Sequence, residues 1–358
     1  MTPPVRVAIA GCGMVAHEYA CTLARSRLIE LAACTDIDSR RADSFAEHHH
    51  IPTVAPLDDL LIEHAIDLLV ILTPPDSHVQ VARTAIEAGV HVHLEKPLAL
   101  DVTEAERLLT FAAQQQVKVG AAPDTFLAPP TQTAAAAIGT GAIGEPLFAS
   151  AALLSGGPER WHPAPQPFYA PRMGPLLDMG PYYLTQLTHL LGPITQVEGA
   201  TATTRPHRTI ATGPQAGHHF TAQAFTHVEA LLKTASGIPV TFTASFDATA
   251  TARPHLEING TEGTLILPDP NFHHGPVQLR RSDSPDWHTL APQTAVPETI
   301  GRGMGVLDTA QALRTDRPTR GTGEQALHVL HVLDLIYRTA SNDERHTSIT
   351  LRNGKSPD

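Results

Sequence analysis

Two short motifs in the first hundred residues combine a backbone suited to phosphate with an amine beside it. Gly11-Cys12-Gly13-Met14-Val15-Ala16 directly follows the apolar run 5–10, and Glu95-Lys96-Pro97 directly follows another apolar run. In a strand–turn–helix unit, the first glycine makes the tight turn and the second lets the backbone approach a pyrophosphate. A small third residue, here Ala16, lets the helix pack on the strand. The first motif therefore predicts a dinucleotide site, and the second places Lys96 beside it.

The residues after the glycines extend this prediction. Met14 and Val15 open the following helix, whose free N–H groups and positive dipole end can hold phosphate oxygens. Asp36 ends the second apolar run, 28–35. A carboxylate at this place accepts the ribose hydroxyls of a dinucleotide.

The same region bears on the choice between NAD and NADP. Asp36 would repel the 2′-phosphate of NADP, whereas Arg40 and Arg41 just beyond it can accommodate that group. We expect NAD, with NADP left open.

Asp178 and Tyr182 form a second candidate group. Their i, i+4 spacing puts them on one side of a helix expected over residues 176–191. Pro181 is tolerated most easily in a first turn, which predicts that the helix begins close to Asp178 and that the site lies at its N-terminus. Alone, each residue has an ordinary structural role, Tyr182 in a core and Asp178 as a cap. Together with Lys96 they are candidate catalytic residues.

Composition limits the class of protein. The 358 residues suggest about two domains, and 42% hydrophobic with 17% charged residues is ordinary for a soluble enzyme. No apolar stretch approaches the roughly 18 residues of a membrane span. The N-terminus lacks a basic segment followed by an apolar core, so we expect a cytoplasmic protein. The net charge of −11 argues against a nucleic-acid partner.

Cysteine and histidine do not predict a metal site. The three cysteines, Cys12, Cys21 and Cys34, show no C-x-x-C spacing, and we expect them reduced and buried. Among the 21 histidines, adjacent ones occur at 48–50, 218–219 and 273–274. None lies in an H-x-x-x-H helix, so we expect loop or helix-end histidines and no metal.

The elements that position these residues follow from the pattern of apolar runs. Strands are expected at 5–10, 28–35, 68–72, 90–94 and 117–120, with helices between them, including 76–88 and one after Asp101. This alternation is typical of a doubly wound parallel sheet. The second part shows consecutive hairpins, typical of an antiparallel sheet, with strands at 147–154, 196–202, 221–233, 238–246, 255–259 and 264–267. Helices are expected there at 176–191, 303–314 and 323–339.

The domain limits follow the change in pattern. We expect a dinucleotide-binding domain over residues 1–126, a substrate-binding and oligomerisation domain over 127–345, and a tail over 346–358 that is frayed at its end.

The motifs together resemble one family. Gly11-x-Gly13-x-x-Ala16, Thr73-Pro74-Pro75, Glu95-Lys96-Pro97, Asp178-x-Gly180-x-Tyr182 and the region 256–263 are similar to the glucose-fructose oxidoreductase/inositol dehydrogenase (Gfo/Idh/MocA) family. The resemblance covers nearly the whole chain. It implies an α/β fold, with an N-terminal Rossmann domain and a C-terminal α/β domain that has an open, mostly antiparallel sheet. It also implies NAD(P)-dependent oxidation or reduction of a sugar or cyclitol hydroxyl, and dimers or tetramers.

The resemblance also assigns roles to single residues. Thr73, Pro74, His78, Glu95 and Lys96 match cofactor-lining positions of the family, although His78 can equally be a helix-face histidine. The commonest family pattern has histidine where this chain has Tyr182. Tyrosine there resembles the glucose-fructose oxidoreductase branch and some sugar ketoreductases.

A mechanism follows as a hypothesis. Free tyrosine and lysine have pKa values near ~10 and ~10.4, so neither is a good base at neutral pH without help. Lys96, as ammonium, would stabilise the developing alkoxide and favour tyrosinate. Tyr182 would relay the proton, and Asp178 would orient the sugar hydroxyl or Lys96.

Candidate substrate residues lie outside these motifs. Asp124 stands in a loop that departs from the family's asparagine-arginine pattern, and either binds a substrate hydroxyl or caps a helix or turn. Trp161 and His162 lie in an aromatic-dense stretch of a chain with 5% aromatic residues, and either stack on a sugar or only pack the loop. Arg172 either binds substrate or pairs with a neighbouring carboxylate.

Two alternatives to a freely exchanging dehydrogenase are a dinucleotide-dependent sensor or repressor without turnover, and a sugar oxidoreductase that retains its cofactor. The presence of Lys96, Asp178 and Tyr182 argues against the sensor. The sequence leaves open the sugar, cyclitol or glycoside, the carbon that reacts, the direction and the number of subunits.

Overall fold

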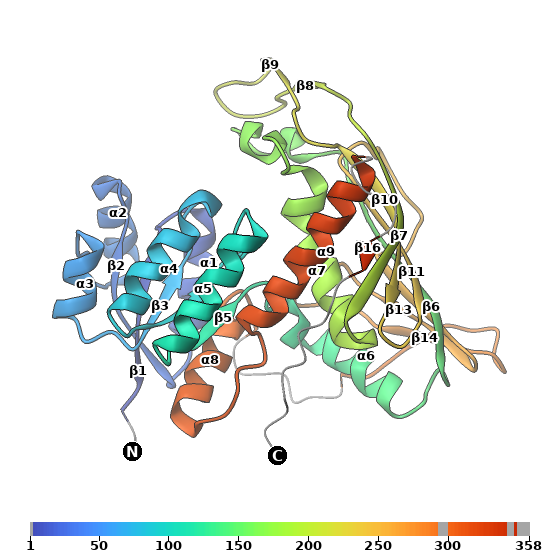
Figure 1. Ribbon diagram of the computed structural model, residues 1–358, viewed down its shortest axis with the longest axis horizontal. Coiled ribbons are helices and arrows are strands. Elements are labelled where there is room, and N and C mark those ends of the chain that lie inside the picture. Colours follow the sequence, from blue (N-terminus) through green and yellow to red (C-terminus); the bar gives the residue numbers. More distant parts are fainter. Residues whose placement is uncertain (1–2, 293–299, 342–346, 349–358) are drawn as a thin grey trace. The chain divides into compact units, whose positions relative to one another are not determined.

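The structure is a computed structural model that describes residues 3–292, 300–341 and 347–348. The chain forms two compact units (Figure 1). The first combines Met1–Gln132 with Pro292–Leu330, and the second combines Thr133–Ala291 with His331–Asp358. This division differs from the predicted limits because the chain returns to the first unit after residue 291.

The first unit is built on a five-stranded sheet whose paired strands are all parallel, in the order β2-β1-β3-β4-β5. Its strands are β1 (Val5–Ala10), β2 (Ile29–Thr35), β3 (Leu68–Ile71), β4 (His91–Leu94) and β5 (Val119–Ala121). Its helices are α1 (Met14–Leu23), α2 (Ser39–His49), α3 (Leu57–Glu63), α4 (His78–Glu87), α5 (Val102–Gln114) and α8 (Met304–Thr315), with short 3-10 turns η1 (Pro75–Ser77) and η2 (Thr125–Leu127). The predicted doubly wound parallel sheet is confirmed.

The core explains why α8 belongs to this unit. Apolar side chains of β1 and β3 are fully buried, as expected for strands covered on both faces. Val306 and Ala310 of α8 lie in the same buried cluster as Val7 and Tyr19. A segment more than 300 residues from the N-terminus thus completes the N-terminal core.

The strand order fixes where a ligand can bind. The chain passes from β1 to β2 on one side and then to β3 on the other, so the order reverses between β1 and β3. In open parallel sheets, ligands bind outside the carboxyl ends of the strands at this reversal. Gly11 follows β1, Thr73 follows β3 and Lys96 follows β4, all at this edge of the sheet.

The second unit holds a nine-stranded sheet in the order β15-β14-β13-β12-β6-β11-β10-β7-β16. Its strands are β6 (Pro146–Leu154), β7 (Ile194–Thr203), β10 (His227–Thr234), β11 (Pro239–Ser245), β12 (Leu256–Gly260), β13 (Gly263–Leu267), β14 (Gln278–Arg281), β15 (His288–Thr289) and β16 (Thr347–Ser348). Only β6 and β11 pair in parallel among these described strands. The predicted open, mostly antiparallel sheet is confirmed.

Smaller elements complete this unit. They are η3 (Pro158–Arg160), η4 (Gln166–Tyr169), the helix α7 (Gly174–Leu191) and a hairpin of β8 (His207–Thr209) and β9 (His219–Thr221). The helices α6 (Pro129–Gly139) and α9 (Gly323–Ala340) each contain a boundary between the two units. The strand expected over 221–233 is two strands, β9 and β10, and the helix expected over 76–88 begins as η1.

Helix α7 begins earlier than predicted. Its first residue is Gly174, and Pro175 occupies the first turn, where a missing N–H is harmless. Pro181 therefore lies inside the helix, and the prediction that the helix begins close to Asp178 is wrong. Gly180 allows close packing at this point, because a Cβ there would lie 2.7 Å from Leu333 of α9.

Within the described residues, no helix is both long and apolar enough to cross a membrane. Of the expected tail 346–358, only Thr347 and Ser348 are among the described residues.

Candidate active site

The first unit contains a cavity of about 1110 Å³ at the carboxyl edge of its sheet. Eight of the predicted cofactor residues line it: Gly11, Gly13, Met14, Val15, Asp36, Arg41, Thr73 and Pro74. The cavity also takes in residues that the sequence analysis missed, among them Ile37, Pro56, Leu57 and Asp76. Pro56 and Leu57 come close because Thr53 forms a parallel bridge with Cys34 at the end of β2. No sequence pattern predicts this bridge.

The glycine turn has the geometry that its motif predicts. Gly11 has a φ of 95°, and a Cβ there would lie 2.7 Å from the backbone of Leu72. Any other residue would push the β1 and β3 loops apart. Gly13 precedes α1, and a Cβ there would meet nothing within 4 Å. The space above Gly13 is open to a ligand that approaches the backbone.

Asp36 is held in place by backbone donors. Its Oδ2 accepts a hydrogen bond from Cys12 N at 2.8 Å, and its Oδ1 accepts one from Asp38 N at 2.9 Å. The side chain is 6% exposed, and Arg41 Nη1 lies 3.7 Å from Oδ2. The carboxylate is thus fixed against the glycine turn, and Arg41 stands at the same wall of the cavity.

The three cysteines are free, but only Cys12 and Cys34 are buried. Cys21 is exposed, so the expectation that all three are buried is wrong. Cys21 lies on α1, and its side chain is exposed at the helix surface.

His78 supports the cavity wall without lining it. It is fully buried, with Nε2 2.9 Å from the carbonyl oxygen of Thr73 and Nδ1 2.8 Å from that of Pro97. The ring therefore ties the loop after β3 to the loop after β4. His78 therefore matches a cofactor-lining position of the family although it supports the cavity only through the loops that it holds.

Glu95 anchors the loop that carries Lys96. Its carboxylate accepts hydrogen bonds from Tyr19 Oη of α1 at 2.9 Å and from Lys96 N at 2.7 Å. Glu95 is buried and Lys96 is half-buried. These two hydrogen bonds hold the backbone at Lys96 in place.

Asp178 and Tyr182 lie in the second unit, one turn apart on α7. Tyr182 is buried and Asp178 is half-buried. The next residue, Tyr183, has a structural role that the sequence analysis missed. Its Oη lies 2.9 Å from His255 Nδ1 and donates to Asp269 Oδ1 at 3.2 Å. Burial, and then Asp269, raise the pKa of Tyr183 well above the ordinary value, so it stays protonated.

Asp124 is engaged in capping. It is 2% exposed, and its Oδ2 accepts hydrogen bonds from Gly303 N at 2.8 Å and Gly305 N at 3.0 Å. These N–H groups belong to the N-terminus of α8. Of the two predicted roles, the cap is present in the structure, and substrate binding stays a prediction.

Trp161 and His162 form a small aromatic cluster with Phe168. The Trp161 and His162 ring centroids lie 5.4 Å apart, and those of His162 and Phe168 lie 5.1 Å apart. Trp161 is 62% exposed. An exposed, edge-packed tryptophan leaves an aromatic surface on which a sugar ring can stack.

A buried ionic network, which no sequence pattern predicts, supports the segment that carries this cluster. Arg208 is 1% exposed and pairs with Glu159 at 2.9 Å and with Asp247. Tyr169 donates a hydrogen bond to Glu159, and the Arg208 guanidinium lies 4.9 Å from the centroid of the Tyr169 ring. Burial, and then the hydrogen bond to Glu159, raise the pKa of Tyr169, so it remains a donor. Together these contacts fix η3 and η4 on either side of Trp161.

The Arg172 side chain contacts two residues of α9. It pairs with Asp334, and its guanidinium lies 4.9 Å from the centroid of the Tyr337 ring. Its side chain is 46% exposed. The predicted pairing of Arg172 with a neighbouring carboxylate is present in the structure, and substrate binding by Arg172 stays a prediction.

Comparison with known proteins assigns the family. Residues 5–122 match the family model described as "Oxidoreductase family, NAD-binding Rossmann fold", and residues 131–266 match the "GFO/IDH/MocA C-terminal domain". The chain belongs to the GFO/IDH/MocA oxidoreductase family. The N-terminal Rossmann fold of this family binds NAD, and the predicted resemblance is confirmed.

Individual relatives agree with this assignment. A UDP-N-acetylglucosamine 3-dehydrogenase of Acidithiobacillus ferrooxidans is 32% identical over 113 residues, which are 32% of this chain and 35% of that relative. The chain thus matches about a third of that relative's length. A dTDP-3,4-didehydro-2,6-dideoxy-alpha-D-glucose 3-reductase of Actinomadura kijaniata is 25% identical over 95% of this chain and 96% of its own.

A solved structure shows the same fold over the whole chain. The crystal structure of an NAD binding oxidoreductase from Klebsiella pneumoniae superimposes with a TM-score of 0.81 and 23% identity, covering 98% of this chain and all of the other.

The first unit fits NAD by its own chemistry. The cavity combines an open glycine turn, a fixed carboxylate and the Thr73 side chain, whose buried Oγ1 has no hydrogen-bond partner among the described residues. A buried hydroxyl without a partner is costly unless a ligand or water meets it. The Gly11–Val15 backbone would hold the pyrophosphate, and Asp36 the ribose hydroxyls.

Proposed function

We propose that this chain is an NAD-dependent oxidoreductase that interconverts a secondary hydroxyl and a ketone of a sugar, cyclitol or glycoside. The observation that carries the proposal is the cavity lined by eight predicted cofactor residues, with Lys96 leaving the adjacent strand at the same edge. The bound nicotinamide would supply hydride transfer. In this proposal the first unit binds the dinucleotide, and the second unit binds substrate and a second subunit.

In this proposal Lys96, Asp178 and Tyr182 carry out the chemistry, and the chain belongs to the tyrosine-containing branch of the family. The Lys96 ammonium stabilises negative charge on the reacting oxygen, and Tyr182 accepts or returns the hydroxyl proton. Asp178 orients the substrate hydroxyl or the lysine. The Glu95 anchor supports this role, because a lysine on a fixed backbone loses less freedom when it meets the substrate.

The substrate class is proposed from the relatives and from the aromatic cluster. Two relatives are named for reactions at a hexose ring. Trp161 offers an exposed aromatic face suited to such a ring, and the Arg208 network holds its segment rigid.

The test is a turnover assay with NAD or NADP against a panel of sugars, cyclitols and glycosides and their ketones, followed by nicotinamide absorbance. We expect turnover by the wild type, with NAD preferred. Lys96→Met and Tyr182→Phe should each lower kcat by about 10²-fold or more, the usual contribution of a positioned charge-stabilising group and of a positioned proton carrier. Tyr183→Phe, its neighbour with a structural role, is the matched control and should keep kcat.

Two outcomes would contradict the proposal. Unchanged turnover in Tyr182→Phe would exclude the proton relay, and full activity in Lys96→Met would exclude the whole scheme. Nucleotide binding without turnover of any compound would instead support a sensor.

Assembly and location are part of the same proposal. We expect a homodimer or homotetramer joined through the large sheet, and a cytoplasmic protein, in keeping with its three free cysteines.

A further inference from the structure

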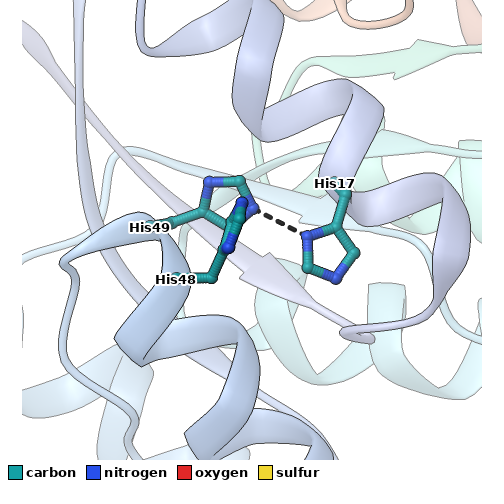
Figure 2. A group of neighbouring side chains, drawn as sticks. All are labelled: His17, His48 and His49. Atoms are coloured by element: carbon teal, nitrogen blue, oxygen red, sulfur yellow. Dashed lines mark hydrogen bonds between the residues drawn. The ribbon is translucent and has the colours of Figure 1, made fainter.

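Three histidines of the first unit meet in space although one of them is distant in the sequence. His17 lies on α1, and His48 and His49 end α2. One ring nitrogen from each lies within 4.8 Å of the others, and none of the three side chains is buried. Figure 2 shows the rings gathered between the two helices, with the His17 and His49 rings joined by a hydrogen bond.

We propose that His17, His48 and His49 form a binding site for one divalent transition-metal ion of the zinc type. Imidazole nitrogen is a preferred ligand of Zn²⁺, Ni²⁺ and Cu²⁺. Three histidines with a fourth position left to water is an established zinc arrangement. This site is separate from the proposed catalytic residues.

The distances suit such an ion with little movement. In a tetrahedral zinc site, metal–nitrogen bonds of about 2.0–2.1 Å place neighbouring ligand nitrogens about 3.3 Å apart. His17 Nδ1 and His49 Nε2 lie 2.9 Å apart, so they need to separate by only a few tenths of an ångström. The His48 ring lies 4.7 Å, centroid to centroid, from that of His49, and one of its nitrogens lies within 4.8 Å of the other two ligand nitrogens.

The surroundings hold the rings in this arrangement. Phe45 is 1% exposed, and its ring centroid lies 4.9 Å from that of His17 and 4.4 Å from that of His49. This apolar wall orients two of the three ligands and limits water on one side of the ion.

A bound ion would join two elements that also form the cofactor cavity. Val15 and Arg41 line the cavity. His17 is two residues after Val15 on α1, and Arg41 lies on α2. The ion would thus fasten the first turn of α1 to the end of α2. Because the unfolded chain does not hold the three histidines together, binding should stabilise the first unit.

The test uses the full chain without a histidine tag, stripped of metal by a chelator. Co²⁺ is added while visible absorption is followed, Zn²⁺ is then used to compete, and equilibrium dialysis gives the stoichiometry. We expect one saturable site per chain, a tetrahedral Co²⁺ spectrum that Zn²⁺ abolishes, and a higher unfolding midpoint with Zn²⁺.

Variants separate this site from general binding by surface histidines. An outer partner of a metal ligand is worth about 10–100-fold in affinity, and a ligand itself at least as much. His17→Gln and His49→Gln should therefore each weaken binding more than about tenfold. His17→Cys, which keeps a ligand atom, should retain a tetrahedral Co²⁺ spectrum with added sulfur charge-transfer bands. His218→Gln, in the other exposed histidine pair, should bind as the wild type does.

Unchanged affinity in His17→Gln would overturn the proposal, because it would show that the sequence-local histidines bind the ion by themselves. Weak uptake of several ions per chain, lowered equally by His218→Gln, would do the same.

Discussion

At the scale of single residues, His93 shows how tightly the first unit encloses a polar group. It lies on β4, is fully buried, and neither ring nitrogen has a hydrogen-bond partner among the described residues. Two glycines make room for it, since a Cβ at Gly120 or Gly305 would lie 2.7 Å from its ring. Burial lowers its pKa below the ordinary 6.5, although Asp124 and Glu95 act the other way. The ring is therefore neutral in the folded chain.

This burial predicts a loss of stability in acid. Below about pH 6.5, residue 93 is protonated in the unfolded chain and neutral in the folded chain. The unfolded state then binds more protons, so the stability of the fold decreases as the pH is lowered. In His93→Leu, the free energy of unfolding should decline less steeply from about pH 7 to about pH 5, by up to about 1.4 kcal/mol per pH unit. Denaturant titrations at several pH values measure this difference.

The exposed His218→Gln should follow the wild-type pH dependence. Equal slopes in wild type and His93→Leu would mean that His93 is protonated in the folded state.

At the scale of elements, one carboxylate connects the end of the parallel sheet to the N-terminus of α8. Asp124, at the end of the parallel sheet, accepts hydrogen bonds from the first N–H groups of α8. A helix N-terminus leaves such groups without intrahelical partners, and a carboxylate there also meets the positive end of the helix dipole. The contact thus joins two segments of one unit that lie 179 residues apart.

Replacing this cap distinguishes the two roles predicted for Asp124. Asp124→Ala leaves two buried N–H groups without their acceptor and should destabilise the chain by about 1–3 kcal/mol. The KM for the substrate found in the turnover assay should stay within about twofold of wild type, because a cap does not contribute binding energy. Thermal or denaturant unfolding and steady-state kinetics give the two values. A stable variant with a strongly raised KM would instead assign Asp124 to the substrate.

At the scale of the whole molecule, the large sheet has one face that the described residues of its own unit leave open. Along β10, residues alternate between buried and exposed, as in a sheet with one covered face. Helix α7 packs against β6, β10 and β11. The pairing of Ser150 with Thr241, and of Thr241 with Leu231, puts these residues on the opposite face together with Phe148. Phe148 is 50% and Leu231 is 53% exposed.

This face predicts how subunits associate. Exposed apolar side chains on a broad sheet mark an interaction surface more often than chance. Phe148→Glu and Leu231→Glu should therefore shift the protein from a dimer or tetramer toward a monomer, as measured by light scattering at micromolar concentration. Ile62→Glu, at an exposed apolar residue of the first unit, is the control and should not change the mass. A monomeric wild type would refute the proposed assembly.

The sequence by itself determined the parts of this protein that depend on neighbouring residues. The glycine turn, the carboxylate at the end of β2 and the five parallel strands could be predicted because each is a local pattern. The turn needs glycine at Gly11 for its φ, and buried strands need continuous apolar runs. Local patterns predict six of the residues that line the cavity, and the family resemblance adds Thr73 and Pro74.

Only the tertiary structure decided the contacts between distant segments. The start of α7 escaped prediction because Pro181 is tolerated inside a helix that packs closely through Gly180. The cap on Asp124 depends on α8, far along the chain, and His17 meets His48 and His49 only because α1 and α2 pack together. Such contacts depend on how whole elements pack, and the spacing of residues within one segment does not predict them.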